Sequence, residues 1–282
     1  MRFAPRFPAR SLPLPAGARA CAVGLALGFA AFAGGAQAQT VAALSGDSTL
    51  TVFDAGTRQV ARTVNVTGAP GRLLGIDVRP ADGQLYGLAA DGTVVTIDPQ
   101  TGRASVKTKL ETTLKPGVAA TVDFNPVADR LRILGTDGTS LRANVDDGKV
   151  VTDGSLKYAD TDASKGRTPA VVAGAYVNSV KGAKETTLYD IDAATGAFLR
   201  QAPPNDGVLV TVGSLGLPAM SGEPAARMMG FDVATDASGA NAGWLVAGRT
   251  LYRVDVGSGR ATPAGEVERL PEGVRDIAVL PN

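Results

Sequence analysis

Two short sequence patterns alternate along this chain in five copies each, and this repeat constrains the fold more than any other feature. The first pattern is an apolar segment that ends in Asp and leads into a Gly-containing turn, as in residues 50–57 and 94–102. The second is an apolar segment with a central Asp that often ends at Pro, as in residues 75–80 and 121–126. Strict alternation of two patterns indicates a repeat architecture.

Each repeat carries signals for several short β-strands. Apolar and polar residues alternate with a period of two in residues 93–97 and 187–191, which is typical of strands. The 35 Gly and 17 Pro favour many turns. Units of about 45–60 residues with four antiparallel strands are typical of propeller blades, and a solenoid or a sandwich is the alternative.

The ends of the repeat predict how the ring closes. No outer strands follow the last copy of the second pattern, at residues 275–281, and no inner strand precedes the first copy of the first pattern. We therefore expect an all-β propeller of five four-stranded blades, with the C-terminal strand joining the N-terminal blade. Residues 149–173 and 213–227 are long enough to hold further strands, so six blades are the alternative.

Three segments inside the repeat carry a family resemblance. They are residues 74–88, residues 122–132 with Val-Asp-Phe-Asn-Pro followed by Leu-Arg, and residues 159–162; Asn178 and residues 187–192 add to them. Over residues 41–280 the chain resembles the domain of unknown function 4394 (DUF4394) family. The resemblance implies a bacterial, exported, propeller-like domain, and it supplies no catalytic residues because that family has no established activity.

The N-terminal segment has the order of features found in a secretory signal peptide. Four arginines and no acidic residue lie in residues 1–20, and an apolar run of 13 residues follows at 21–33. The run is too short for a stable membrane-spanning helix. Ala36-Gln37-Ala38 fits a cleavage site, so we expect residues 1–38 to be removed and residues 39–282 to form one periplasmic or secreted domain. An uncleaved anchor is the alternative.

The composition excludes several classes of function. The chain has no histidine, which excludes a Ser-His-Asp triad and an imidazole-bound zinc. Its one cysteine, Cys21, falls in the expected signal peptide, so the mature chain has no thiol. With 28 basic and 27 acidic side chains and no basic block, the chain lacks the charge pattern of a nucleic-acid-binding protein.

The Asp of the first pattern is expected to have a structural role. An Asp at the start of a tight turn accepts a hydrogen bond from its own backbone two residues on, and the following Gly tolerates a positive φ. Repetition in every unit favours this interpretation over calcium binding. The residues concerned are Asp54, Asp98, Asp146, Asp192 and Asp255.

The Asp of the second pattern is the better candidate for a ligand or cation site. In a propeller the first strand of each blade lines the central channel, so Asp77, Asp123, Asp232 and Asp276 are expected to face one axis. Carboxylates around one axis repel each other and favour a bound cation such as calcium. The competing interpretation, which repetition favours, is that each Asp caps the backbone of a neighbouring strand. Tyr176 occupies the matching position in the remaining unit.

Two further groups of residues are weaker candidates. Asp160, Asp162 and Ser164 alternate like the ligands of a calcium loop, but the expected Glu at the twelfth position is missing, which favours a polar surface loop. Four arginines could gather on one face to hold an anion, although scattered solvated side chains are the default; they are Arg79, Arg130, Arg132 and Arg142.

These observations predict an exported, non-catalytic binding or scaffold propeller. Its partner would be an unidentified protein or small molecule, with no nucleic acid, no cofactor, and no membrane span after signal cleavage, and we expect a monomer. The alternative is a hydrolase or lyase, for example one that acts on carbohydrates, with Asp residues at the channel. The scarcity of Glu and of aromatic residues disfavours a sugar site.

Overall fold

The computed structural model describes residues 39–217 and 227–281, together with Met1 and Phe3. The chain divides into two units, Met1–Ala36 and Gln37–Asn282, and all the described strands belong to the second. The expected signal cleavage at residue 38 lies outside the described residues, so it stays a prediction. Among the described residues, no helix is long and apolar enough to cross a membrane.

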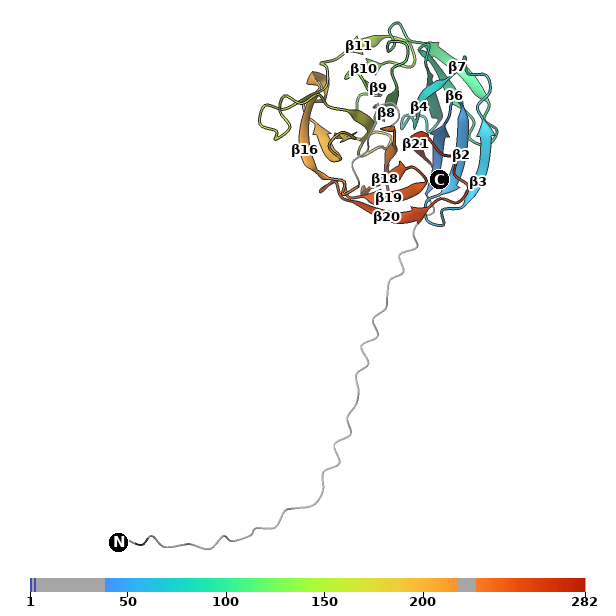
Figure 1. Cartoon of the computed structure of the whole chain (residues 1–282). Coiled ribbons are helices and arrows are strands. Elements are labelled where there is room, and N and C mark those ends of the chain that lie inside the picture. The colour runs from blue at the N-terminus through green and yellow to red at the C-terminus, as the bar shows by residue number, and fades with distance from the viewer. Residues whose placement is uncertain (2, 4–38, 218–226, 282) are drawn as a thin grey trace, which may run out of the picture. The chain divides into compact units, whose positions relative to one another are not determined.

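The described strands form five sheets arranged as the blades of a propeller (Figure 1). We number the blades in chain order and give their strands from the axis outward. Blade 1 consists of β21 (Val274–Leu280), β1 (Thr40–Ser45), β2 (Thr49–Asp54) and β3 (Val60–Asn65). Blade 2 consists of β4 (Leu73–Val78), β5 (Leu85–Ala89), β6 (Thr93–Ile97) and β7 (Ala104–Lys109). Blade 3 consists of β8 (Ala120–Asn125), β9 (Arg130–Gly135), β10 (Ser140–Ala143) and β11 (Val150–Thr152).

The last two blades complete the ring. Blade 4 consists of β13 (Val171–Tyr176), β14 (Leu188–Asp192), β15 (Ala197–Gln201), β16 (Val208–Ser214) and β12 (Lys157–Tyr158). Blade 5 consists of β17 (Gly230–Thr235), β18 (Asn241–Ala247), β19 (Thr250–Val254) and β20 (Ala261–Glu266). The prediction of a five-bladed propeller is confirmed.

Blade 4 departs from the expected four strands. The short strand β12 pairs in parallel with β16 at the outer edge of the sheet and adds a fifth strand. Of the two segments that left room for a sixth blade, residues 149–173 provide β11, β12, loop and the start of β13. Residues 213–214 of the other segment end β16, and residues 218–226 lie outside the described part of the chain. An outermost strand leaves backbone N–H and C=O groups unpaired, and β12 covers part of that edge.

The ring closes where the sequence predicts. β21 pairs antiparallel with β1, with Leu280 opposite Thr40 and Ile277 opposite Ala43. Both strands would otherwise leave an open edge, so the pairing of the chain's two ends completes blade 1. Arg275 adds to the closure: its guanidinium donates to the carbonyl oxygens of Gly46, at 2.5 Å, and Leu73, at 2.8 Å.

Apolar side chains between adjacent blades form the core. The inner strands are buried along most of their length, whereas exposure alternates along the outermost strand β3. Between blades 2 and 3, the rings of Tyr86 and Phe124 meet edge to face with centroids 5.2 Å apart. The period-two pattern of the outer strands and the near-continuous apolar inner strands both follow from this burial.

Candidate functional site

Four buried carboxylates lie on the inner strands around the propeller axis. Asp77 on β4, Asp123 on β8, Asp232 on β17 and Asp276 on β21 are each 5 % exposed or less. A carboxylate oxygen from each of the first three lies within 4.8 Å of the other two. The fold therefore brings together residues that are far apart in the sequence.

Each of these carboxylates accepts a hydrogen bond from the inner strand of the next blade. Listed around the ring, the donors are Ile76 N to Asp276, at 3.0 Å; Phe124 N to Asp77, at 2.6 Å; Tyr176 N to Asp123, at 2.9 Å; and Val279 N to Asp232, at 2.6 Å. We call these four bonds the axial latch. They are the contacts that the strand-capping interpretation requires, and the functional roles of the four residues stay predictions.

The interface between blades 4 and 5 uses a different pair of side chains because Tyr176 replaces the Asp. Asn178 N donates to Asn241 Oδ1 at 2.9 Å, and Asn241 Nδ2 donates to Asn178 Oδ1 at 2.8 Å. Sequence reasoning missed this pair. The signal available was Asn178 two residues after Tyr176, but its partner lies 63 residues away.

One glycine makes room for the latch. A Cβ on Gly75 would lie 2.4 Å from Asp276 Oδ2, closer than side chains approach each other. Without a side chain at this position, the Asp276 carboxylate reaches Ile76 N across the interface between blades 1 and 2. The Gly that precedes Asp77 by two residues therefore serves the neighbouring blade's Asp.

Burial and mutual repulsion raise the pKa values of the axial carboxyls. Burial is the largest cause at Asp77 and at Asp123, and the charges of neighbouring axial carboxylates add to it. Burial raises the pKa of Asp232 to about 6 and raises that of Asp276 well above its ordinary value. Carboxylates this close cannot all ionise at neutral pH, so the group either holds protons or binds a cation.

The hydrogen bonds of the axial carboxylates leave few oxygens for a cation. Both oxygens of Asp77 and both of Asp232 accept backbone N–H groups. Among the described residues, Asp123 Oδ2 is the one oxygen of the four carboxylates that accepts no hydrogen bond. Because calcium takes about six to eight oxygen ligands, this donor set fits backbone capping better than a calcium cage.

Three of the predicted turn residues accept backbone N–H groups within their own turns: Asp98 from two residues on, as expected, and Asp54 and Asp255 from three residues on. Asp54, Asp98 and Asp255 accept N–H groups of their own turns, from Thr57 at 2.6 Å, Gln100 at 2.8 Å and Ser258 at 2.8 Å respectively. Hydrogen bonds lower the pKa of all three, mainly from Thr57 N at Asp54, Thr101 Oγ1 at Asp98 and Ser258 N at Asp255. Each turn connects the third and fourth strands of its blade.

The assignment of the turn role to Asp146 is wrong. Asn144 occupies that position: its backbone oxygen accepts Gly148 N at 2.8 Å and its side chain accepts Asp146 N at 3.1 Å. Asp146 instead forms ion pairs with Arg79 at 2.7 Å and Lys107 at 2.9 Å, and the hydrogen bond from Arg79 is the largest cause of its strongly lowered pKa. Because Asn can begin this turn as well as Asp can, the sequence did not show which of the two residues does so.

Asp192 makes the same local turn at a different point of its blade. Its Oδ1 accepts Ala194 N at 2.7 Å, but the turn connects the second and third strands of blade 4. Asp192 is also fully buried, and Tyr158 donates a hydrogen bond to it. In blade 4 the turn pattern therefore follows the second strand and not the third. The hydrogen bonds of such a turn are local, so the pattern does not indicate which strands the turn connects.

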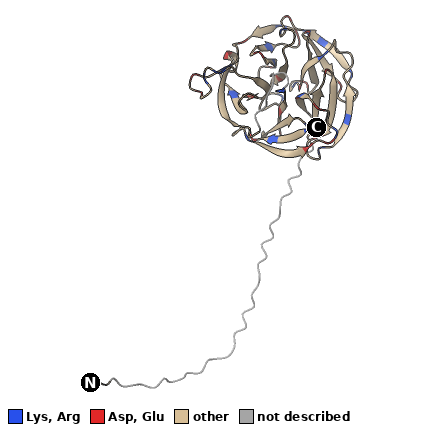
Figure 2. Cartoon of the chain, in the orientation of Figure 1, with Lys and Arg blue, Asp and Glu red and all other residues tan. Residues whose placement is uncertain are grey.

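The remaining sequence candidates do not converge on a ligand. Arg79 pairs with Asp129 at 2.6 Å and with Asp146, while Arg132 and Arg142 share Asp153. Arg130 donates to the Asp129 carbonyl oxygen at 2.8 Å, so each of the four arginines is engaged by groups of the protein itself. In the proposed calcium loop, Asp162 accepts Thr211 N at 2.7 Å and Ser164 N at 2.8 Å, whereas Asp160 pairs with Lys165. Figure 2 shows basic and acidic residues spread around the ring.

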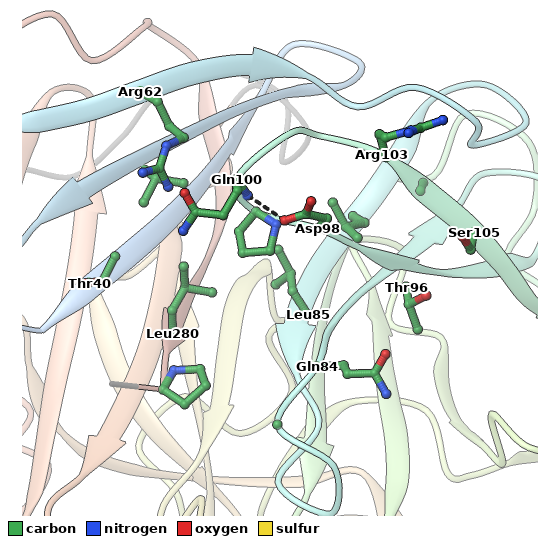
Figure 3. A pocket seen from close by; sticks show the side chains of 16 residues that line it. Thr40, Arg62, Gln84, Leu85, Thr96, Asp98, Gln100, Arg103, Ser105 and Leu280 are labelled. Carbon is green, nitrogen blue, oxygen red and sulfur yellow. Dashed lines mark hydrogen bonds between the residues drawn. The ribbon is translucent and has the colours of Figure 1, made fainter.

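Two adjoining cavities open between the blades. The interblade cleft lies between blades 1 and 2, has a volume of about 790 Å³, and is lined by residues that include Arg62, Gln84, Thr96, Asp98 and Leu280 (Figure 3). The axial mouth, of about 300 Å³, is lined by Asp77, Asp232, Lys181 and other residues. Gly83, Leu280 and Pro281 line both cavities, so the two cavities are neighbours that share a wall.

Comparison with known families decides where this propeller belongs. The model of the family described as "Domain of unknown function (DUF4394)" matches residues 49–278, which include most of all five blades. The chain belongs to the DUF4394 family. A search of curated proteins finds no match to this DUF4394 chain.

Solved structures share the fold of this DUF4394 protein at low sequence identity. A structural genomics protein of unknown function from Bacteroides thetaiotaomicron VPI-5482 matches with a TM-score of 0.50 and 15% identity, over 79% of this chain and 55% of that chain. An auxiliary nutrient binding protein from Bacteroides ovatus ATCC 8483 matches with a TM-score of 0.44 and 15% identity, over 80% and 56%. The DUF4394 chain thus spans little more than half the length of these proteins.

One buried carboxyl of the DUF4394 protein escaped the sequence analysis. Asp190 on β14 is fully buried, and neither of its oxygens has a hydrogen-bond partner among the described residues. Burial raises its pKa to about 8, an effect that the charge of Arg132 partly offsets. The alternation in residues 188–192 could have indicated that Asp190 faces inward with its strand neighbours, but not that it lacks a partner.

Proposed function

We propose that this DUF4394 propeller is an exported, non-catalytic binding protein, and that its ligand surface is formed by the neighbouring interblade cleft and axial mouth. One observation carries the proposal: the axial carboxylates are engaged with backbone N–H groups, while two adjoining cavities share a wall at Gly83, Leu280 and Pro281. Concave surfaces of this size are where proteins bind small ligands.

The hydrogen bonding of the axial carboxylates supports binding over catalysis. A glycoside hydrolase needs two carboxyl groups in different environments on either side of a bound sugar. Asp77, Asp123 and Asp232 instead lie within 4.8 Å of one another, and all three are buried. Each holds a strand of the next blade, so a substrate that used the hydrogen-bonded oxygens would have to displace the axial latch.

Export rests on the N-terminal sequence. The arginines, the short apolar run and Ala36-Gln37-Ala38 follow the order of a cleaved signal peptide. The intact mass of protein recovered from the periplasm or the medium tests this step. A mass that begins at Gln39 is expected, and a mass that retains residues 1–38 would contradict export by cleavage.

A ligand panel tests the binding function. Mature protein is heated with sugars, peptides, nucleotides and organic acids, and a ligand at about 100 times its Kd should stabilise the fold by about 2.7 kcal/mol. Pro281 lies in the wall that both cavities share, so Pro281→Trp places a bulky side chain there and should abolish the stabilisation by ligand. Val151→Trp, on the exposed edge strand β11 and 52% exposed, is the matched control and should retain it.

The same panel separates binding from catalysis. Each compound that stabilises the protein is incubated with it and recovered, and we expect it unchanged. Chemical conversion of a compound that is lost in Asp123→Asn, with the fold intact, would instead support the hydrolase or lyase alternative.

A further inference from the structure

The interblade cleft combines an apolar floor with a polar rim. Val52, Leu85 and Ile97 lie beneath the floor and are almost fully buried. The partly exposed Pro99, Ala104 and Leu280 provide its accessible apolar surface. Figure 3 shows Arg62 of blade 1 on one side and Thr96 of blade 2 on the other. Such a surface can bury an aliphatic group while hydrogen bonding a polar chain above it.

The side chains of the rim are not engaged within the protein. Among the described residues, the backbone N–H groups of Gln84 and Gln100 donate hydrogen bonds, but their side-chain amides make none. The hydroxyls of Thr40, Thr96 and Ser105 make none either. An amide offers a donor and an acceptor together, which matches the N–H and C=O of a peptide group. The rim can therefore pair with a chain that carries both kinds of group.

The charge of the cleft is also unbalanced. Arg62 and Arg103 line it, and neither forms an ion pair among the described residues. Asp98 is the acidic residue in the lining, and the charge of Arg62 adds to the hydrogen bond from Thr101 in lowering its pKa, so the lining keeps one positive charge in excess. A ligand that carries a carboxylate would complement this excess and could form charge-assisted hydrogen bonds with the Arg62 guanidinium.

We propose that the interblade cleft binds an extended peptide segment in which an acidic side chain lies beside aliphatic ones. This inference rests on the proposed binding function and specifies its ligand class. Peptide is favoured over carbohydrate because the lining contains no Phe, Tyr or Trp on which a sugar ring could stack. The acidic side chain meets Arg62, and the aliphatic side chains cover the floor.

A displayed library of short random peptides tests the proposal. The library is selected on immobilised mature protein, in parallel on Arg62→Met and on Arg200→Met. Arg200 is an exposed arginine on β15 in blade 4 and outside the cleft, so its variant is the matched control. We expect enrichment of Asp or Glu flanked by Val, Ile or Leu on the wild type and on Arg200→Met, and loss of that enrichment on Arg62→Met.

Affinities of the selected peptides provide a second measurement. Arg62→Met should weaken binding by about tenfold or more, because it removes a charge-assisted contact. A Gln replacement of the acidic side chain in the peptide should weaken binding to the wild type by a similar factor and leave binding to Arg62→Met unchanged.

Three outcomes would overturn the peptide proposal. They are peptides enriched without acidic residues, enrichment that Arg62→Met retains, and no enrichment above the Pro281→Trp background. If a sugar or nucleotide from the ligand panel binds the cleft instead, the binding function stands and the peptide class fails. If neither the library nor the panel yields a ligand whose binding is abolished by Pro281→Trp, both proposals fail.

Discussion

Aspartate serves three different purposes in this protein, and the surroundings of each carboxyl decide which one. At Asp98 the carboxylate is exposed and accepts hydrogen bonds from its own turn, which lowers its pKa. At Asp77 the carboxylate is buried and reaches the next blade, and its pKa is raised. At Asp190 burial comes without any hydrogen-bond partner among the described residues. The same residue type therefore stabilises turns, connects blades and, at Asp190, lowers the stability of the fold when the carboxyl is ionised.

Substitution of two axial residues should separate their contributions. Asp77→Asn should lower the free energy of unfolding by about 1–3 kcal/mol, because an amide can keep only one of the two backbone N–H bonds. Asp123→Asn should cost less than 1 kcal/mol, or about nothing, because its oxygen can still accept Tyr176 N while the amide faces Asp77 and Asp232. Urea denaturation of both variants at neutral pH measures the difference. Equal losses would contradict this distinction between the two sites.

Asp190→Asn should stabilise the protein as the pH rises. The pKa of Asp190 is raised to about 8 in the folded chain, against the ordinary value of 3.8 for an Asp carboxyl. Its contribution to stability is fully present below the lower value and is lost as the pH rises toward the higher one. The variant has no such loss, so its advantage should grow between these values by at most about 1.4 kcal/mol per pH unit. Denaturation at pH 5 and pH 8 measures the change; an advantage that does not grow with pH would show that Asp190 is not buried unpaired.

At the scale of single elements, β21 contributes more than its length suggests. It completes blade 1 by pairing with β1, carries Asp276 of the axial latch, and places Arg275 against blade 2. It also supplies Val279 N, which Asp232 of blade 5 accepts. This one strand therefore connects blade 1 to both of its neighbours.

Removal of residues 274–282 should lower the melting temperature far more than removal of residues 1–38. The truncation exposes an unpaired strand edge on β1 and breaks two of the four latch bonds. A loss of 1 kcal/mol shifts Tm by about 2–4 °C in a domain of this size, and several such losses should add. Calorimetry on the two deletions measures this. A truncated chain that melts within about 2 °C of the mature protein would rule out closure by β21.

The strand order was predictable from the sequence to the extent that local signals repeat. The two alternating patterns give five blades, and the unpaired copies at the two ends predict the β21–β1 pairing. The fifth strand β12 was not predictable, because two residues that pair in parallel with β16 carry no periodicity. The sequence did not distinguish the turn at Asp192 from the turn at Asp98, although they connect different strands of their blades, because both side chains accept the N–H two residues on.

At the scale of the whole molecule, the propeller gathers buried acidic side chains at its axis and satisfies them with backbone N–H donors of neighbouring blades. The burial of Asp77, Asp123, Asp232 and Asp276 could be expected from their repeated positions on inner strands. Their individual partners could not, because each bond joins two strands that are at least 47 residues apart. Likewise, the interblade cleft depends on how blades 1 and 2 diverge, which no local pattern records.

The response of the axial carboxylates to calcium tests most directly whether they connect blades or hold a cation. Urea midpoints are measured for the mature protein and for Asp77→Asn, each with calcium chloride and with EDTA. Because the latch uses backbone N–H donors, we predict that calcium leaves the midpoint of the mature protein unchanged, and that Asp77→Asn is less stable by the same amount in both solutions. A midpoint that calcium raises in the mature protein but not in Asp77→Asn would contradict the latch and establish a cation site at the axis.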